Sequence, residues 1–179
     1  ISWQITDDIA VRDCVVERCS GSGLHPGAGS LRSTIAGCRC RDNGLAGLFV
    51  CWRVRHGTFR DNDFSGNGVC GVSIGHKDSD NRFENNAIRD NGFCGVMFRK
   101  EKAGQGADRN VWTGNAIDGN GGADGGYGVY AEPGSRDNVF RGNAIGQSAD
   151  GRQRVAFRLD EGVDNFDIST EAAAAANPA

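Results

Sequence analysis

The chain has 179 residues, of which 38% are hydrophobic and 24% are charged, and its formal net charge is −3. This composition is too apolar for a disordered protein, and the small negative charge provides no overall field that would attract nucleic acid. The longest apolar stretch, around residues 48–52, is far shorter than the ~18 residues of a membrane span. Glycine, with 28 copies, has roughly twice its usual share, so particular positions must require it.

In chain order, the first feature is a repeat with a period of 24 residues. Residues 34–53, 58–77 and 82–101 align without a gap, and Phe59 and Phe83 fall on equal positions. The same register is carried upstream and downstream by Cys14, Val16, Trp112, Asn115, Phe140 and Asn143, and a seventh repeat is expected to start at Phe166 and Ile168.

Each repeat predicts short β-strands joined by tight turns. Apolar residues alternate over short runs interrupted by Asn and Gly, and no stretch has a sustained helical period. A solenoid with three short strands in each turn is a parallel β-helix. The sequence therefore predicts an all-β fold of about six rungs, each of ~24–29 residues, over residues 1–168. Residues 169–179 are expected to form an alanine-rich tail or cap, with a short helix over residues 171–176.

Equal positions on successive rungs form columns along the solenoid axis, ~4.8 Å apart. One column is expected to form a buried ladder of side-chain amides: Asn62, Asn86, Asn115 and Asn143. Cys14 and Cys38 continue it, and Cys70 and Cys94 form another column. The seven cysteines contain no CxxC motif and are expected to be mostly buried free thiols, with a disulfide between adjacent rungs as the alternative. Glycines are expected at turns after Asn and before each strand, where backbone conformation would require them.

This repeat resembles that of the right-handed parallel β-helix proteins of the pectate-lyase-like superfamily, which include pectate lyases, polygalacturonases and alginate epimerases. The similarity covers residues 5–168 and rests on structural residues, so it implies the fold and leaves the reaction open. It also implies an extracellular or periplasmic location, although the chain starts at Ile1 without a signal sequence. The first rung has no evident cap, which indicates a longer parent chain or self-association through that end.

Residues that depart from the repeat gather on one side of the predicted solenoid. The residue directly after the repeated glycine, such as Leu48 or Val72, points inward, so the next one points outward and the turn follows. Two of the three histidines and two of the three lysines lie on this strand face and turn. The candidate site residues there are His25, Trp52, Arg53, His76, Lys77, Arg99, Lys100, Glu101, Tyr130 and Glu132.

The chemistry of these residues suits an acidic polysaccharide. Trp52 and Tyr130 could stack on sugar faces, and Arg53 could form two parallel hydrogen bonds with a carboxylate. The other substrate-binding candidates are His25, Lys77, Glu101 and Glu132. The alternative interpretation is that these are ordinary solvated charges, with Lys77 and Glu101 in a surface ion pair.

Two reactions are compatible with such a site. A lyase or epimerase removes the proton alpha to a uronate carboxylate, which requires a base, His76 or Lys100, and a cation that neutralises the acid, Arg99 or Arg53. A glycoside hydrolase would instead need two carboxylates, and the acids available to it are Asp78, Asp80, Glu101 and Glu132.

Residues 71–76 resemble the polygalacturonase pattern around its histidine, and residues 96–100 resemble its later Arg and Lys strand. The paired aspartates of that family are missing, because residues 49–51 are Phe, Val and Cys. Proton abstraction is therefore the favoured reaction. A noncatalytic β-helix that binds glycans or serves as a structural module is the alternative from another class.

Further predictions concern the turns and loops beside the candidate site. His56 lies in the column of Asp80 and is expected to form a hydrogen bond with it that stabilises the turn. Lyases of the superfamily use calcium, so the resemblance makes Asp78 and Asp80 candidates for a calcium site, although two acids in a turn also suit a solvated loop. The glycine-rich stretch 121–128 is expected to be an inserted loop in the fifth rung that forms a groove wall.

Overall fold

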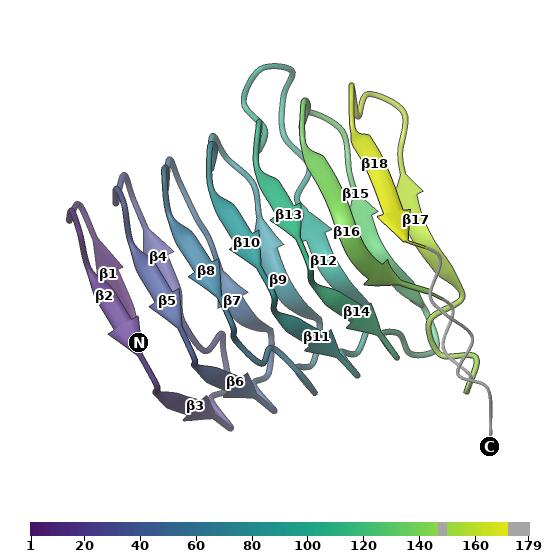
Figure 1. Ribbon diagram of the computed structural model, residues 1–179, viewed down its shortest axis with the longest axis horizontal. Coiled ribbons are helices and arrows are strands. Elements are labelled where there is room, and N and C mark those ends of the chain that lie inside the picture. Colours follow the sequence, from purple (N-terminus) through teal and green to yellow (C-terminus); the bar gives the residue numbers. More distant parts are fainter. Residues whose placement is uncertain (147–149, 172–179) are drawn as a thin grey trace.

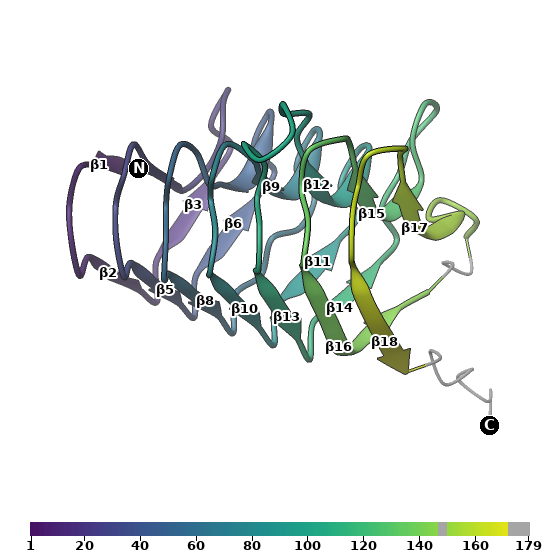
Figure 2. The same cartoon turned by 90° about the horizontal axis from the view of Figure 1, so that it is seen from above.

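The computed structural model describes residues 1–146 and 150–171. All regular elements within these ranges are β-strands, and strands of successive turns pair in parallel. The chain winds as a solenoid whose turns lie side by side along the long axis (Figures 1 and 2). The prediction of an all-β parallel β-helix of about six rungs is confirmed. The helix expected over residues 171–176 falls outside the described residues, apart from Glu171, which ends the last strand.

Three parallel sheets run along the solenoid. Sheet I contains β2 (Ala10–Arg12), β5 (Thr34–Ala36), β8 (Thr58–Arg60), β10 (Arg82–Glu84), β13 (Val111–Thr113), β16 (Val139–Ile145) and β18 (Asp167–Glu171). Sheet II contains β3 (Val15–Glu17), β6 (Arg39–Arg41), β11 (Ala87–Arg89), β14 (Ala116–Asp118) and the end of β16. Sheet III contains β7 (Ala46–Phe49), β9 (Cys70–Ile74), β12 (Cys94–Phe98), β15 (Tyr127–Ala131) and β17 (Val155–Leu159). The pair of β1 (Ser2–Gln4) and β4 (His25–Gly27) extends it at the N-terminal end, joined to it by isolated bridges at Leu24–Leu48 and Gly27–Cys51.

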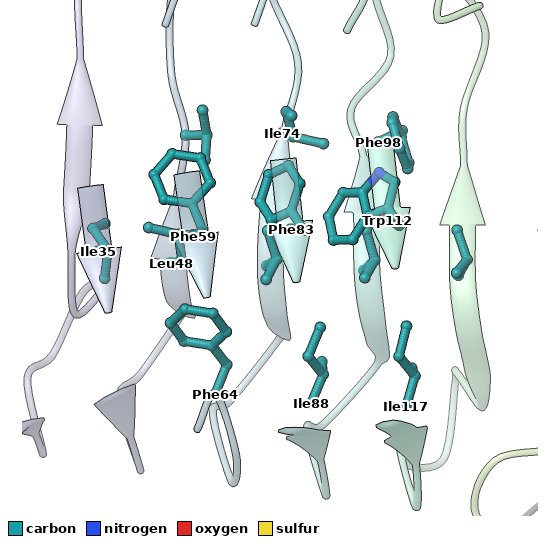
Figure 3. Packing of buried hydrophobic residues seen from close by; sticks show 14 of the residues in the cluster. Ile35, Leu48, Phe59, Phe64, Ile74, Phe83, Ile88, Phe98, Trp112 and Ile117 are labelled. Carbon is teal, nitrogen blue, oxygen red and sulfur yellow. The ribbon is translucent and has the colours of Figure 1, made fainter. Parts of the chain in front are cut away.

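The interior is filled by columns of apolar side chains that occupy equal places on successive turns. Phe59, Phe83, Trp112 and Phe140 stack with ring centroids 4.9, 3.7 and 5.4 Å apart, and Figure 3 shows the first three in line. The residues predicted to point inward after the repeated glycine are all fully buried: Leu24, Leu48, Val72, Val96 and Val129. The register taken from the sequence is therefore correct, and so are the directions of the side chains that follow it.

Buried asparagines join the turns. Asn62 donates a hydrogen bond from Nδ2 to Oδ1 of Asn86 at 3.0 Å, and its backbone N–H donates to the same oxygen. The pattern continues through Asn115 and Asn143, which confirms the predicted ladder. Cys38 continues the column, because its backbone N–H donates to Asn62 Oδ1 at 2.9 Å.

Two more ladders are present that the sequence analysis did not predict. One runs through Asn43, Asn67, Asn91, Asn120 and Gln153, and the other through Asn81, Asn110 and Asn138. The first of these occupies the Asn-Gly pairs, which the sequence analysis treated only as turn signals. All seven cysteines are free thiols, as predicted, and four of them are buried.

The repeated glycines are required by close approach between neighbouring parts of the chain. A Cβ on Gly71 would lie 2.4 Å from Cγ2 of Ile88, and one on Gly44 would lie 2.2 Å from the carbonyl oxygen of Ser20. Neither glycine has a positive φ, whereas Asp42, with φ of 55°, does. The expectation that backbone conformation requires glycine is therefore wrong for Gly44 and Gly71, where steric room requires it instead, whereas Gly121 after Asn120 does have a positive φ, of 131°.

Two insertions widen the solenoid at the edges of sheet III. Ladder residues are 24 apart at Asn62 and Asn86 but 29 apart at Asn86 and Asn115, because a loop near residues 102–106 follows β12. It is the widest turn at the top of Figure 1. The glycine-rich insertion near residues 121–126 precedes β15 and borders Phe93, whose carbonyl oxygen accepts the Gly126 N–H. The two loops thus lie at opposite edges of one sheet.

Candidate functional site

An outward-facing row of side chains crosses sheet III. The strand register places Phe49 beside Ser73, Ser73 beside Met97, and Met97 beside Tyr130. His25 extends the row, with its ring centroid 5.0 Å from that of Phe49 in an edge-on contact. This outer row, from His25 to Tyr130, lies outside the main core and forms one continuous surface over five turns.

Arg99 lies across the outer row and points back toward the N-terminal turns. Nη1 donates to Ser73 Oγ at 2.7 Å, Nη2 donates to the Val50 carbonyl oxygen at 2.8 Å, and the guanidinium carbon lies 4.6 Å from the Phe49 ring centroid. Gly75 leaves the necessary room, because a Cβ there would lie 2.8 Å from Arg99 Nε. The Arg99 side chain remains 21% exposed, so this cation is fixed but can still be reached from solvent.

A buried carboxylate holds Arg99 from the core side. Asp78 has no exposed surface, and its oxygens accept the Val54 and Gly75 N–H groups at 3.0 and 3.1 Å. Arg99 Nη2 lies 3.4 Å from Oδ2 of Asp78. Burial raises the pKa of Asp78 to about 7, although these hydrogen bonds and Arg99 act in the opposite direction. Because it is enclosed, Asp78 can position Arg99 but cannot touch a ligand.

The turn after β9 and β12 brings His76 and Glu101 together. Nδ1 of His76 lies 3.2 Å from Oε2 of Glu101, and the two side chains are 27% and 21% exposed. The Trp52 ring lies over the imidazole with its centroid 5.2 Å away. An imidazole whose Nδ1–H is held by a carboxylate presents its Nε2 lone pair to solvent, which is the arrangement of a general base. Glu101 therefore contacts His76 rather than the Lys77 of the alternative interpretation.

The other candidates surround this pair. Arg53 lies 5.7 Å from the Trp52 ring centroid, and Lys100 is exposed with its backbone N–H bonded to Glu132 Oε2 at 3.0 Å. The Lys77 backbone N–H is bonded to the inserted loop at Gln105 and Gly106.

The polar groups at the two ends of the outer row have partners within the protein. The pKa of His25 is lowered, first by burial and then by the charges of Arg99 and the N-terminus. Tyr130 donates to Asp160 Oδ2 at 3.0 Å, and burial together with this bond raises its pKa to about 12. Both side chains are half-buried, so they offer ring edges and faces rather than mobile polar groups.

Asp78 and Asp80 do not fit a shared calcium site. Asp78 is enclosed by backbone donors, whereas Asp80 accepts two hydrogen bonds of 2.8 Å from Arg109 in the next turn of the chain. Over residues 1–146 and 150–171, no group of three or more His, Cys, Asp or Glu side chains could hold a metal ion. Asp80 also takes Arg109 as its partner in place of the predicted His56, because the long arginine reaches from the following turn.

Part of the surface was not predicted from the sequence. On β17, the Arg158 guanidinium lies 5.6 and 5.8 Å from the ring centroids of Tyr127 and Tyr130. Arg158 and Tyr127 border an open cavity of about 710 Å³ at the C-terminal end of the outer row. The alternation of residues 155–159 is typical of a β-strand. The spacing before this run departs from the 24-residue period, so the sequence did not show which residues of the preceding turn lie beside it.

The fold and the outer row define a parallel β-helix with a fixed cation and a histidine–carboxylate pair on one sheet. Residues 1–145 match the family described as "Right handed beta helix region", and the chain belongs to that family. The sequence has no match among curated proteins. No helical segment in the described ranges is long and apolar enough to cross a membrane.

Two solved structures have the same fold: the A-modules of the mannuronan C-5 epimerases AlgE6 and AlgE4 of Azotobacter vinelandii. The TM-scores are 0.61 and 0.54, and each is 17% identical to this chain. The alignments cover 92% and 93% of this chain but 53% and 61% of those chains. The chain therefore spans less than two thirds of their length, and the likeness at this identity shows the fold alone.

Proposed function

We propose that the outer face of sheet III binds an acidic polysaccharide, and that His76 removes the proton alpha to a uronate carboxylate. This is the step that polysaccharide lyases and uronate epimerases share. The observation that carries the proposal is the 3.2 Å contact between His76 Nδ1 and Glu101 Oε2, beside Gly75, over which the fixed Arg99 lies. The epimerase neighbours support this choice of substrate class.

The chemistry follows from the positions of these groups. Glu101 accepts the Nδ1–H of His76, so Nε2 is free to take the C5 proton, and the carboxylate then stabilises the imidazolium that forms. Arg99 would hold the uronate carboxylate and lower the energy of the carbanion. In a lyase, the electron pair forms the C4–C5 double bond as the O4 substituent leaves; in an epimerase, a proton returns to C5 from the opposite face.

His76 is a better base than Lys100 in this structure, because Glu101 orients the imidazole while Lys100 is exposed at the surface. A hydrolase is less well supported. Of its four candidate acids, Asp78 is enclosed and Asp80 is bonded to Arg109, so they cannot flank a glycosidic bond together.

Loss of the C5 hydrogen tests the proposal directly. The protein is incubated with polymannuronate or polygalacturonate in D2O, and NMR measures two products: deuterium at C5, which an epimerase introduces, and the H4 signal of the C4–C5 double bond, which a lyase forms. We expect one of these products from the wild-type protein and a loss of about 100-fold or more in His76→Ala. His56→Ala is the matched control, because His56 is exposed and the histidine that contacts Glu101 is His76; this variant should keep full activity.

Two results would contradict the proposal. Equal product formation by His76→Ala and wild type would remove His76 as the base. Binding of the polymers by the wild-type protein with neither deuterium incorporation nor double-bond formation would favour the noncatalytic glycan-binding module.

A further inference from the structure

A small apolar pocket lies on the outer face of sheet III beside Arg99. Its volume is about 190 Å³, and its apolar lining consists of Leu45, Ala46, Phe49, Val69, Cys70 and Met97. Ala46 and Cys70 are buried at its floor, whereas Leu45 at the rim is 53% exposed. All of the apolar lining residues except Leu45 belong to an apolar cluster separate from the main core. A concave, mostly apolar site on the outside of a solenoid is a candidate binding site for a ligand.

The pocket is continuous with the proposed carboxylate site. Phe49 and Ser73 line the pocket, and both also contact Arg99, at 4.6 Å from the ring centroid and 2.7 Å from Oγ. A sugar whose carboxylate meets Arg99 would therefore bring its neighbouring substituents over the pocket. The lining contains no charged side chain, so an ionised group would lose its hydration there without compensation.

The size and polarity of the pocket select the occupant. At about 190 Å³ it is smaller than the ~300–1,000 Å³ of pockets that enclose drug-sized ligands. A bare sugar face would need partners for its hydroxyl groups, but Ser73 Oγ already accepts from Arg99, and the remaining polar side chain is Ser22. A short acyl substituent needs few such partners and buries a methyl group.

We propose that this apolar pocket binds an O-acetyl group of the acidic polysaccharide, so that the protein prefers acetylated over unsubstituted uronate chains. The inference rests on the proposed function, because Arg99 must hold the carboxylate that brings the acetyl group to the pocket. Burial of one methyl group corresponds to about a fivefold gain in affinity.

Calorimetric titration of the full chain with two matched ligands tests this inference. One is O-acetylated polymannuronate, and the other is the same sample after mild alkaline deacetylation, so length and charge spacing are equal. We expect about fivefold tighter binding of the acetylated sample. Leu45→Ser should bring the ratio close to one, whereas Val15→Ser should keep it, because Val15 is 59% exposed on sheet II, away from the pocket.

Equal affinity of the wild-type protein for the two samples would overturn the acetyl pocket and leave the proposed function intact. A preference that survives unchanged in both Leu45→Ser and Val69→Ser would also overturn it, since both side chains line the pocket. If neither sample binds, the proposed function fails and the acetyl pocket fails with it.

Discussion

At the scale of single residues, the sequence predicted the place of Arg99 in the repeat but not the contacts of its side chain. The 24-residue register predicted that His76 and Arg99 follow equivalent strands of successive turns, and they follow β9 and β12 in the structure. It could not show that Arg99 turns back over Gly75 to reach Ser73, because that depends on a side-chain rotamer and on the absence of one Cβ. The sequence analysis also interpreted Asp78 as part of a solvated loop or a calcium site. In the structure this carboxylate is completely buried and accepts hydrogen bonds from backbone N–H groups.

The buried Asp78 predicts an unusual dependence of stability on pH. Its pKa is about 7 in the folded protein against 3.8 for an ordinary aspartate, so the folded state binds more protons than the unfolded state between these values. The free energy of unfolding should therefore fall as pH rises from about 4 to 7, and this effect should level off above pH 7. Asp78→Asn should remove that component, which urea unfolding of both proteins across this range will measure.

The quantity to compare is the difference in unfolding free energy between the wild-type protein and Asp78→Asn at each pH. His25, with its lowered pKa, makes the folded protein less stable as pH falls below its ordinary value of 6.5, but this effect is common to both and cancels. Unfolding free energies that differ by a constant amount at every pH would show that Asp78 is not protonated in this range.

At the scale of elements, the three amide ladders explain why short strands form stable sheets. Most strands have three to five residues, too few for stability on their own. Each ladder asparagine satisfies backbone groups on two turns, as when Asn86 Nδ2 donates to the Phe59 carbonyl oxygen at 2.9 Å. The sequence revealed one ladder, since its asparagines interrupt apolar runs, and concealed those in Asn-Gly pairs, which also signal turns.

Cys38 occupies a ladder position without the amide, so Cys38→Asn should stabilise the protein. The thiol lies 3.7 Å from the Val11 carbonyl oxygen, to which a carboxamide would donate a stronger hydrogen bond. Its oxygen would accept the Cys14 N–H, as Asn62 accepts that of Cys38. We expect a gain of about 1 kcal/mol in the free energy of unfolding, measured by urea titration.

Asn86→Ala is the reverse change and provides the comparison. It leaves buried groups of Asn62, Phe59 and Asn115 without their partner, so a loss of about 3 kcal/mol is expected. A loss of stability in Cys38→Asn would mean that the first turns have no room for the amide.

At the scale of the whole molecule, the solenoid was predictable because one period fixes every column at once. Phe59 and Phe83, or Leu48 and Val72, needed no tertiary information to be placed. The insertions at residues 102–106 and 121–126 broke the period, so the register did not predict the contacts of Tyr127 with β17, although it still placed Val129 and Asn143 correctly. An insertion leaves the alternation of inward-facing apolar residues recognisable. It changes the spacing between turns, so the sequence no longer predicts which outward-facing side chains are neighbours.

Each turn contacts only its neighbours, so stability should vary along the axis. The central turns have complete ladders and the aromatic column, whereas the first turn has Ile5 and Val15 exposed at 83% and 59%. Hydrogen exchange followed by mass spectrometry should therefore show the slowest exchange in β8 to β12 and the fastest in β1 to β3. Phe83→Leu should accelerate exchange in the central turns, because it interrupts the column between Phe59 and Trp112. Identical rates in the first and central turns would instead show that the solenoid unfolds as one cooperative unit, with the coupling between turns exceeding the differences within them.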